Sequence, residues 1–218
     1  APPAAARASV AAAGFAALRE PEVARLCALL TLGCAMTRGV LDVFVPVHLD
    51  EVFGVPPSGI GQLFGLGTVC YLIGSLFGGR VLTAAPGRTR RALLRAAHAA
   101  LAAAAVSVLR TGSHRALGAV FATFLACSAF INVGANLQLD SLGAKLGRTD
   151  SVAALSVLSW SAGFALGGVL AQAFAHTAAS RRAALLAVGV VNALWLLWGD
   201  SVDLTCRRPG ARGAVGAG

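Results

Sequence analysis

The residues best suited to chemistry are Arg38 and Asp42, a charged pair inside an apolar segment. They lie four residues apart, so on a helix they share one face and can pair. An ionised side chain deep in a membrane costs about 2.5 to 3.5 kcal/mol, and such residues mark ion or substrate pathways. Asp42 is therefore either a proton- or substrate-binding carboxylate tuned by Arg38, or half of a neutralised pair that helps insertion. We favour the first interpretation, because a helix without either charge would insert more easily.

A second polar feature follows helical spacing. Ser128, Asn132, Asn136 and Asp140 recur every four residues and would form one stripe along a helix face. Asn has no reason to face lipid. The stripe either makes hydrogen bonds between helices, worth about 0.6 kcal/mol each in membranes, or lines a cavity. For the cavity we predict six lining residues: Ser128, Asn132, Asn136, Trp160, Gln62 and Tyr71.

Glycines spaced by four form a third pattern, in three pairs: Gly61 and Gly65, Gly74 and Gly78, and Gly163 and Gly167. Small residues at this spacing let the backbones of two membrane helices approach closely. We interpret them as helix-packing positions.

The segments that carry these residues are typical of a membrane. The chain has 218 residues, of which 57% are hydrophobic and 12% charged, and a mean hydropathy of +0.75. Helices of roughly 20 apolar residues span a bilayer. We predict an all-α, polytopic protein with six transmembrane helices in a 3+3 repeat, over these segments: Leu26 to Leu49 with a kink at Pro46, Ser58 to Gly79, Ala92 to Leu109, Ala116 to Leu139, Ser151 to Ala175 and Ala183 to Gly199.

Loop charge predicts the orientation, because short cytoplasmic loops carry excess Lys and Arg. With six spans, one side receives thirteen basic residues: Arg7, Arg19, Arg25, Arg80, Arg88, Arg90, Arg91, Arg95, Lys145, Arg148, Arg207, Arg208 and Arg212. The other side receives four: Arg110, Arg115, Arg181 and Arg182. Both termini are therefore expected to be cytoplasmic. Which membrane holds the protein does not follow from this count.

Several classes of protein are disfavoured by the sequence. GxSxG, HExxH and GxxxxGK[ST] motifs are absent and the four histidines are scattered, so we expect no enzyme. The net charge of +9 comes from Arg residues between apolar runs, with no aromatic-interleaved basic face, so we expect no nucleic-acid partner. The five cysteines occur singly without metal-ligand spacing, so we predict neither a metal site nor a cofactor.

Three stretches carry a family resemblance: LREPEV, LDVFVPVHLDEVFGVPPSGIGQLFGLGTVCYLIGSLFGGRV and LSWSAGFALGGVLAQAF. Over about residues 18 to 200 the chain resembles the C-terminal six-helix half of major facilitator superfamily transporters, most of all the vesicular amine transporter and drug:proton antiporter group. In that family an acid stands at the position of Asp42. No acid lies between Arg115 and Asp140, or between Asp150 and Asp200, where the amine transporters carry further acids.

The resemblance implies a twelve-helix transporter that works by alternating access, with a missing N-terminal six-helix half as the partner. We expect a cytoplasmic linker at 1–22, a six-helix half-transporter domain at 23–199 and a disordered cytoplasmic tail at 200–218. The expected function is proton-coupled transport of a small organic solute across a lipid bilayer. The alternative is a truncated or degenerate homologue that does not transport and acts as a scaffold or partner.

Overall fold

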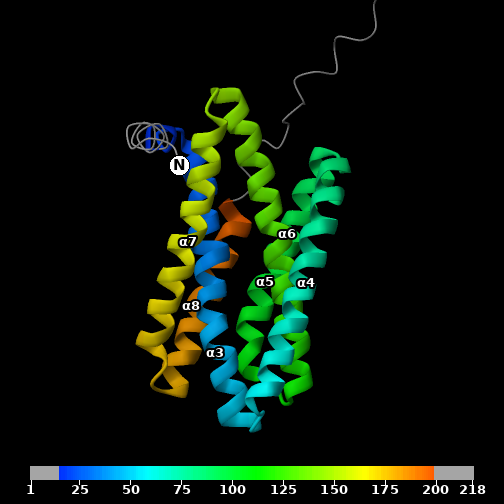
Figure 1. Cartoon of the computed structure of the whole chain (residues 1–218), viewed down its shortest axis with the longest axis vertical. Helices are drawn as coiled ribbons and strands as arrows, with labels where there is room; N and C mark the ends of the chain where they lie inside the picture. The colour runs from blue at the N-terminus through cyan, green and yellow to red at the C-terminus, as the bar shows by residue number, and fades with distance from the viewer. Residues whose placement is uncertain (1–14, 199–218) are drawn as a thin grey trace, which may run out of the picture.

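The computed structural model describes residues 15–198, which contain helices and no strand. The expected tail at 200–218 lies outside the described residues, as do residues 1–14 of the expected linker. The longer helices stand side by side (Figure 1). The elements are, in chain order, α2 (Pro21–Ala28), η1 (Leu29–Ala35), α3 (Met36–Phe53), α4 (Pro57–Ala84), α5 (Gly87–Ser107), η2 (Val108–Arg110), α6 (His114–Leu146), α7 (Thr149–Phe174) and α8 (Ala178–Trp198).

The first three elements form one continuous helical run, Pro21–Phe53. Pro46 lies inside α3, which continues past it. The departure from α-helical geometry comes earlier, in the π-helical η1, where the amide of Met36 donates to the carbonyl of Thr31, five residues back. The Thr31 hydroxyl donates to the carbonyl of Cys27 at 2.8 Å. Side-chain bonds of this kind satisfy carbonyls that a π-helical turn leaves without an amide partner, and such turns often occur at functional sites.

Local sequence accounts for several helix ends. Gly54 and Gly147 follow α3 and α6 with φ of 59° and 64°, a left-handed conformation that glycine adopts without steric cost. Pro57 opens α4, where its missing amide proton is not needed. Ser113 caps α6 by accepting a hydrogen bond from the amide of Ala116 at 3.2 Å.

Two helices extend further than the apolar runs predict. α4 continues through Arg80 to Ala84, so the expected basic loop is reduced to a short break before Gly87. α6 continues past Asp140 to Leu146. Charged residues ended the predicted segments because they end the apolar run, but a helix can carry exposed charges beyond the hydrocarbon without breaking.

Four helical runs among the described residues are long and apolar enough to cross a membrane: Pro21–Phe53, Pro57–Ala84, His114–Leu146 and Thr149–Phe174. Such runs are typical of a membrane protein. α5 and α8, which were also expected to span, are not among them. α5 carries four arginines in its first half, Arg88, Arg90, Arg91 and Arg95. α8 carries Arg181 and Arg182 near its start, and the uncharged part that follows, residues 183–198, is shorter than the roughly 20 residues that span a bilayer.

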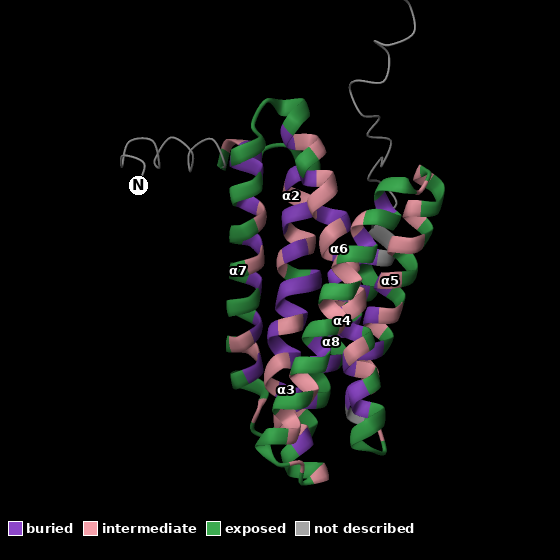
Figure 2. Cartoon of the chain, turned by 45° about the vertical axis from the view of Figure 1, so that its right-hand side comes forward, coloured by how far each residue is buried: buried purple, intermediate pink, exposed green. Residues whose placement is uncertain are grey.

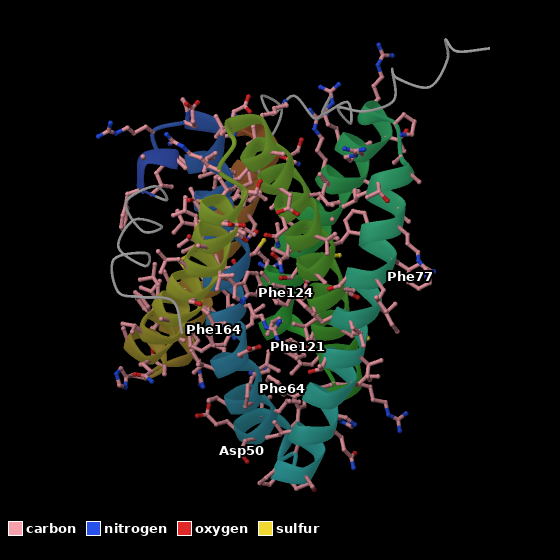
Figure 3. All side chains as sticks on the ribbon, turned by 45° about the horizontal axis from the view of Figure 1, so that its top comes forward. Asp50, Phe64, Phe77, Phe121, Phe124 and Phe164 are labelled. Carbon is pink, nitrogen blue, oxygen red and sulfur yellow. The ribbon has the colours of Figure 1, made fainter. Side chains whose placement is uncertain are left out.

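The run Pro21–Phe53 packs on α7, α4 packs on α6, and α5 packs on both α6 and α8. α7 therefore turns its buried residues inward and its exposed residues outward (Figure 2). Between α4 and α6, aromatic rings fill the interior. The rings of Phe64 and Phe121 have centroids 5.0 Å apart, and Phe124 stacks on Phe121 at 6.4 Å. Figure 3 shows this group inside the bundle, whereas Phe77 points outward from α4.

Candidate functional site

The charged pair lies on α3 as its spacing predicts. The Arg38 Nε–H donates to Asp42 Oδ2 at 3.5 Å, and the two side chains are 23% and 22% exposed. That distance is at the long end for a hydrogen bond, so the ion pair is loose. The neighbouring Leu41 and Phe44 are fully buried, which fixes the helix face on which the pair stands.

Tyr71 of α4 adds a second partner for Arg38. The guanidinium carbon lies over the tyrosine ring, 4.8 Å from its centroid. A cation over an aromatic face is attracted by the ring quadrupole, by about 0.5 to 2 kcal/mol depending on exposure. Arg38 is thus held by an anion on its own helix and by a ring from another.

The same tyrosine reaches α6. The Asn132 side-chain amide donates to the Tyr71 hydroxyl at 2.9 Å. Asn136 in turn donates to Asn132 Oδ1 at 2.9 Å and to the Asn132 carbonyl at 3.0 Å. The two asparagines, one helical turn apart, are therefore hydrogen-bonded to each other, and Asn132 joins them to α4.

Ser156 of α7 completes the chain by donating to Asn136 Oδ1. The result is one connected set of polar side chains drawn from α3, α4, α6 and α7, which we call the polar path: Asp42, Arg38, Tyr71, Asn132, Asn136 and Ser156. Polar side chains linked in this way polarise one another in a low-dielectric interior. The six side chains therefore form one contiguous set of contacts across four helices.

The other expected lining residues lie off the polar path. Ser128 is fully buried, and its hydroxyl has no hydrogen-bond partner among the described residues. Trp160 is half-buried and packs against both hydrophobic clusters of the bundle. Gln62 is exposed on α4. The structure thus brings together five of the predicted substrate and lining residues and leaves three apart.

The glycine pairs differ in what they meet. A Cβ at Gly163 would overlap the carbonyl oxygen of Thr31, and one at Gly167 would come 2.9 Å from the Gly39 Cα. A Cβ at Gly74 would come 2.6 Å from the Ala126 carbonyl oxygen, and one at Gly78 would come 3.1 Å from the Phe130 ring. These four positions lie where helix backbones approach closely. By contrast, no described atom lies within 4 Å of a Cβ at Gly61 or Gly65, so the predicted close packing is not found there.

Two further interactions, away from the polar path, were also not predicted from the sequence. Asn192 of α8 donates to the Thr37 hydroxyl at 2.9 Å, and both residues are fully buried. Arg181 donates to Glu51 Oε2 at 2.6 Å and joins the start of α8 to the end of α3. The sequence could have indicated a buried hydrogen bond at Asn192, because this residue is an asparagine within an apolar run, as Asn132 is. Ser156 had no comparable signal among the several serines of α7.

Among residues 15–198, no group of three or more His, Cys, Asp or Glu side chains is placed to hold a metal ion. Comparisons with protein-family models, with curated proteins and with solved structures find no match to this chain.

Proposed function

We propose that this chain is the C-terminal six-helix half of a proton-coupled secondary transporter for a small organic solute, of the major facilitator type. The observation that carries the proposal is the polar path, which joins four helices and contains an acid. Asp42 lies in the middle third of the run Pro21–Phe53. The acids that follow it in the described helices are all exposed: Asp50, Glu51, Asp140 and Asp150. Ionisable groups within membrane segments mark such pathways.

The proton step follows from the contacts of Arg38. When Asp42 is ionised, the guanidinium is attracted to both the carboxylate and the Tyr71 ring. Protonation of Asp42 removes the first attraction and leaves the second. The Arg38 guanidinium is then held mainly by the Tyr71 ring of α4. Because Tyr71 is hydrogen-bonded to Asn132, this change alters the forces between α3, α4 and α6. Charge neutralisation at Asp42 is thereby coupled to helix position.

The packing supports a repeat of three helices. With Pro21–Phe53 counted as the first helix, α4 as the second, and α6 and α7 as the fourth and fifth, the first packs on the fifth and the second packs on the fourth. A shift of three helices converts one pair into the other. The glycines follow the same rule, because Gly163 and Gly167 of the fifth helix and Gly74 and Gly78 of the second make the close approaches. Such internal repeats are typical of secondary transporters.

The exposed surface of α4 supports the proposal that a second half of the transporter packs against this chain. Of its 28 residues only Gly67, Gly78 and Leu82 are buried, and large apolar side chains such as Leu76 and Phe77 are more than 60% exposed. In the proposal, lipid covers part of this surface and the N-terminal half of the transporter covers the rest. We therefore expect the chain by itself to show no saturable uptake in liposomes.

The test is Asp42→Asn, made in the full-length transporter that contains this chain. The amide keeps the shape of the carboxylate but cannot titrate, so proton-driven accumulation should fall at least tenfold while expression stays normal. Asp140→Asn is the matched control, because Asp140 is an exposed acid on α6 outside the polar path. Uptake should be measured across a range of imposed pH gradients.

If Asp42→Asn retains normal pH-dependent accumulation, the carboxylate is structural and the proton-coupling part of the proposal is wrong. If the wild-type protein accumulates no solute under any imposed pH gradient, the result counts against transport and favours the alternative, a membrane protein that acts as a scaffold or partner.

A further inference from the structure

A cavity of about 400 Å³ opens between α5 and α8, away from the polar path. Its described lining is Val106 and Arg110 from the end of α5 and the following turn, and Arg182, Leu185 and Leu186 from α8. Ligand sites in proteins commonly have volumes of about 300 to 1,000 Å³. With a liquid-water share of about 30 Å³ per molecule, the space is large enough for a phosphate group together with the atoms to which it is esterified.

The cavity has two positively charged lining residues and no acidic one among its described lining. Arg110 and Arg182 converge on it. The adjacent Arg181 differs, because it is buried and pairs with Glu51 at 2.6 Å. Two guanidinium groups that face one cavity repel each other unless an anion lies between them, and arginine's planar fork suits the oxygens of a phosphate.

The remaining wall is apolar and leads outward along α8. Leu185 is buried, whereas Leu186 is 50% exposed. Val190 and Leu194 follow Leu186 at intervals of four residues and are 57% and 55% exposed. Residues at this spacing share one helix face. An exposed apolar stripe therefore begins at the cavity and runs along the helix away from the two arginines.

We propose that this cavity binds an anionic phospholipid, with the phosphate between Arg110 and Arg182 and one acyl chain along Leu186, Val190 and Leu194. A soluble anion would use the arginines but would leave the apolar wall and the stripe without a partner. A zwitterionic lipid would cover the stripe but would bring its own cation to the arginines. Guanidinium groups form charge-assisted hydrogen bonds with the oxygens of a phosphate headgroup, and this holds on either side of a membrane. The inference is independent of the proposed transport function.

The experiment titrates the purified chain in detergent with phosphatidylglycerol or phosphatidylcholine and counts bound lipids by native mass spectrometry. We expect phosphatidylglycerol to bind at least tenfold more tightly than phosphatidylcholine. The double variant Arg110→Gln, Arg182→Gln should lose this preference. Arg115→Gln is the matched control, because Arg115 is an exposed arginine at the start of the neighbouring α6, outside the cavity lining, and it should keep the preference.

A second comparison separates the lipid from a free anion. Leu186→Ser should weaken phosphatidylglycerol binding several-fold, and millimolar inorganic phosphate should not displace the lipid. The proposal is overturned if the double variant binds phosphatidylglycerol as the wild type does, or if inorganic phosphate competes fully and Leu186→Ser has no effect. Circular dichroism and thermal unfolding of each variant establish that it is folded before binding is compared.

Discussion

The guanidinium of Arg38 lies over the ring of Tyr71, 4.8 Å from the ring centroid. α4 packs mainly on α6, so this contact ties α4 to a charged residue of α3. The Tyr71 hydroxyl accepts a hydrogen bond from Asn132 at 2.9 Å, so one side chain links three helices. Tyr71 is the junction of the polar path, and its ring and its hydroxyl can be tested separately.

Tyr71→Phe removes the hydroxyl and keeps the ring. It should lower the free energy of unfolding in detergent by about 0.6 kcal/mol, the typical value of a hydrogen bond between membrane helices. Tyr71→Leu also removes the ring below Arg38 and should lower the free energy of unfolding by about 0.5 to 2 kcal/mol more. Leu72→Ala, at an exposed neighbouring position, is the control. If Tyr71→Leu unfolds like Leu72→Ala, Tyr71 is not the junction.

The close approach of α7 to the first helical run depends on Gly163. In Gly163→Ala, the added methyl group overlaps the Thr31 carbonyl oxygen. Because a backbone atom cannot rotate away, the helices must separate, which should lower the free energy of unfolding by about 1 to 3 kcal/mol. Gly61→Ala is the control, since open space surrounds a Cβ there and alanine favours a helix by up to about 1 kcal/mol. Equal unfolding midpoints for the two variants would contradict the packing.

The buried hydrogen bond between Asn192 and Thr37 should show a coupling energy. Asn192→Leu leaves the Thr37 hydroxyl buried without its partner at 2.9 Å, which should cost about 1 to 3 kcal/mol. Adding Thr37→Val removes the stranded hydroxyl, so the double variant should be more stable than the sum of the single changes predicts. The free energies of unfolding of the wild type, the two single variants and the double variant, measured under one condition, test this prediction. Additive effects would mean that the two groups do not interact.

The orientation can be measured with single cysteines in a cysteine-free background. The α4–α5 and α6–α7 connections lie at the same end of the bundle (Figure 1), and the loop-charge rule predicts that this end is cytoplasmic. Pro86→Cys and Leu146→Cys should therefore be protected from a membrane-impermeant thiol reagent in intact cells and react after permeabilisation. Gly112→Cys, at the other end, should react without permeabilisation. Labelling of the Pro86→Cys or Leu146→Cys variant in intact cells would show the opposite orientation.

The features that followed from sequence are local ones. Arg38 and Asp42 share a helix face because helical periodicity places residues four apart together, and the same reasoning places Asn132 beside Asn136. The lengths of the apolar runs predict an all-α protein with membrane-crossing helices, of which four are long and apolar enough by composition. None of these inferences requires knowledge of which helices are neighbours.

The features that needed the tertiary structure are the ones that join distant segments. Tyr71 meets Arg38 and Asn132, and Ser156 meets Asn136, because α4 and α7 turn particular faces toward α3 and α6. In a chain rich in alanine, leucine and glycine most faces of a helix are apolar, so periodicity does not indicate which face is turned inward. For the same reason Gly163 and Gly61 look alike in sequence, yet only Gly163 lies against another backbone. Helix packing alone decides between them.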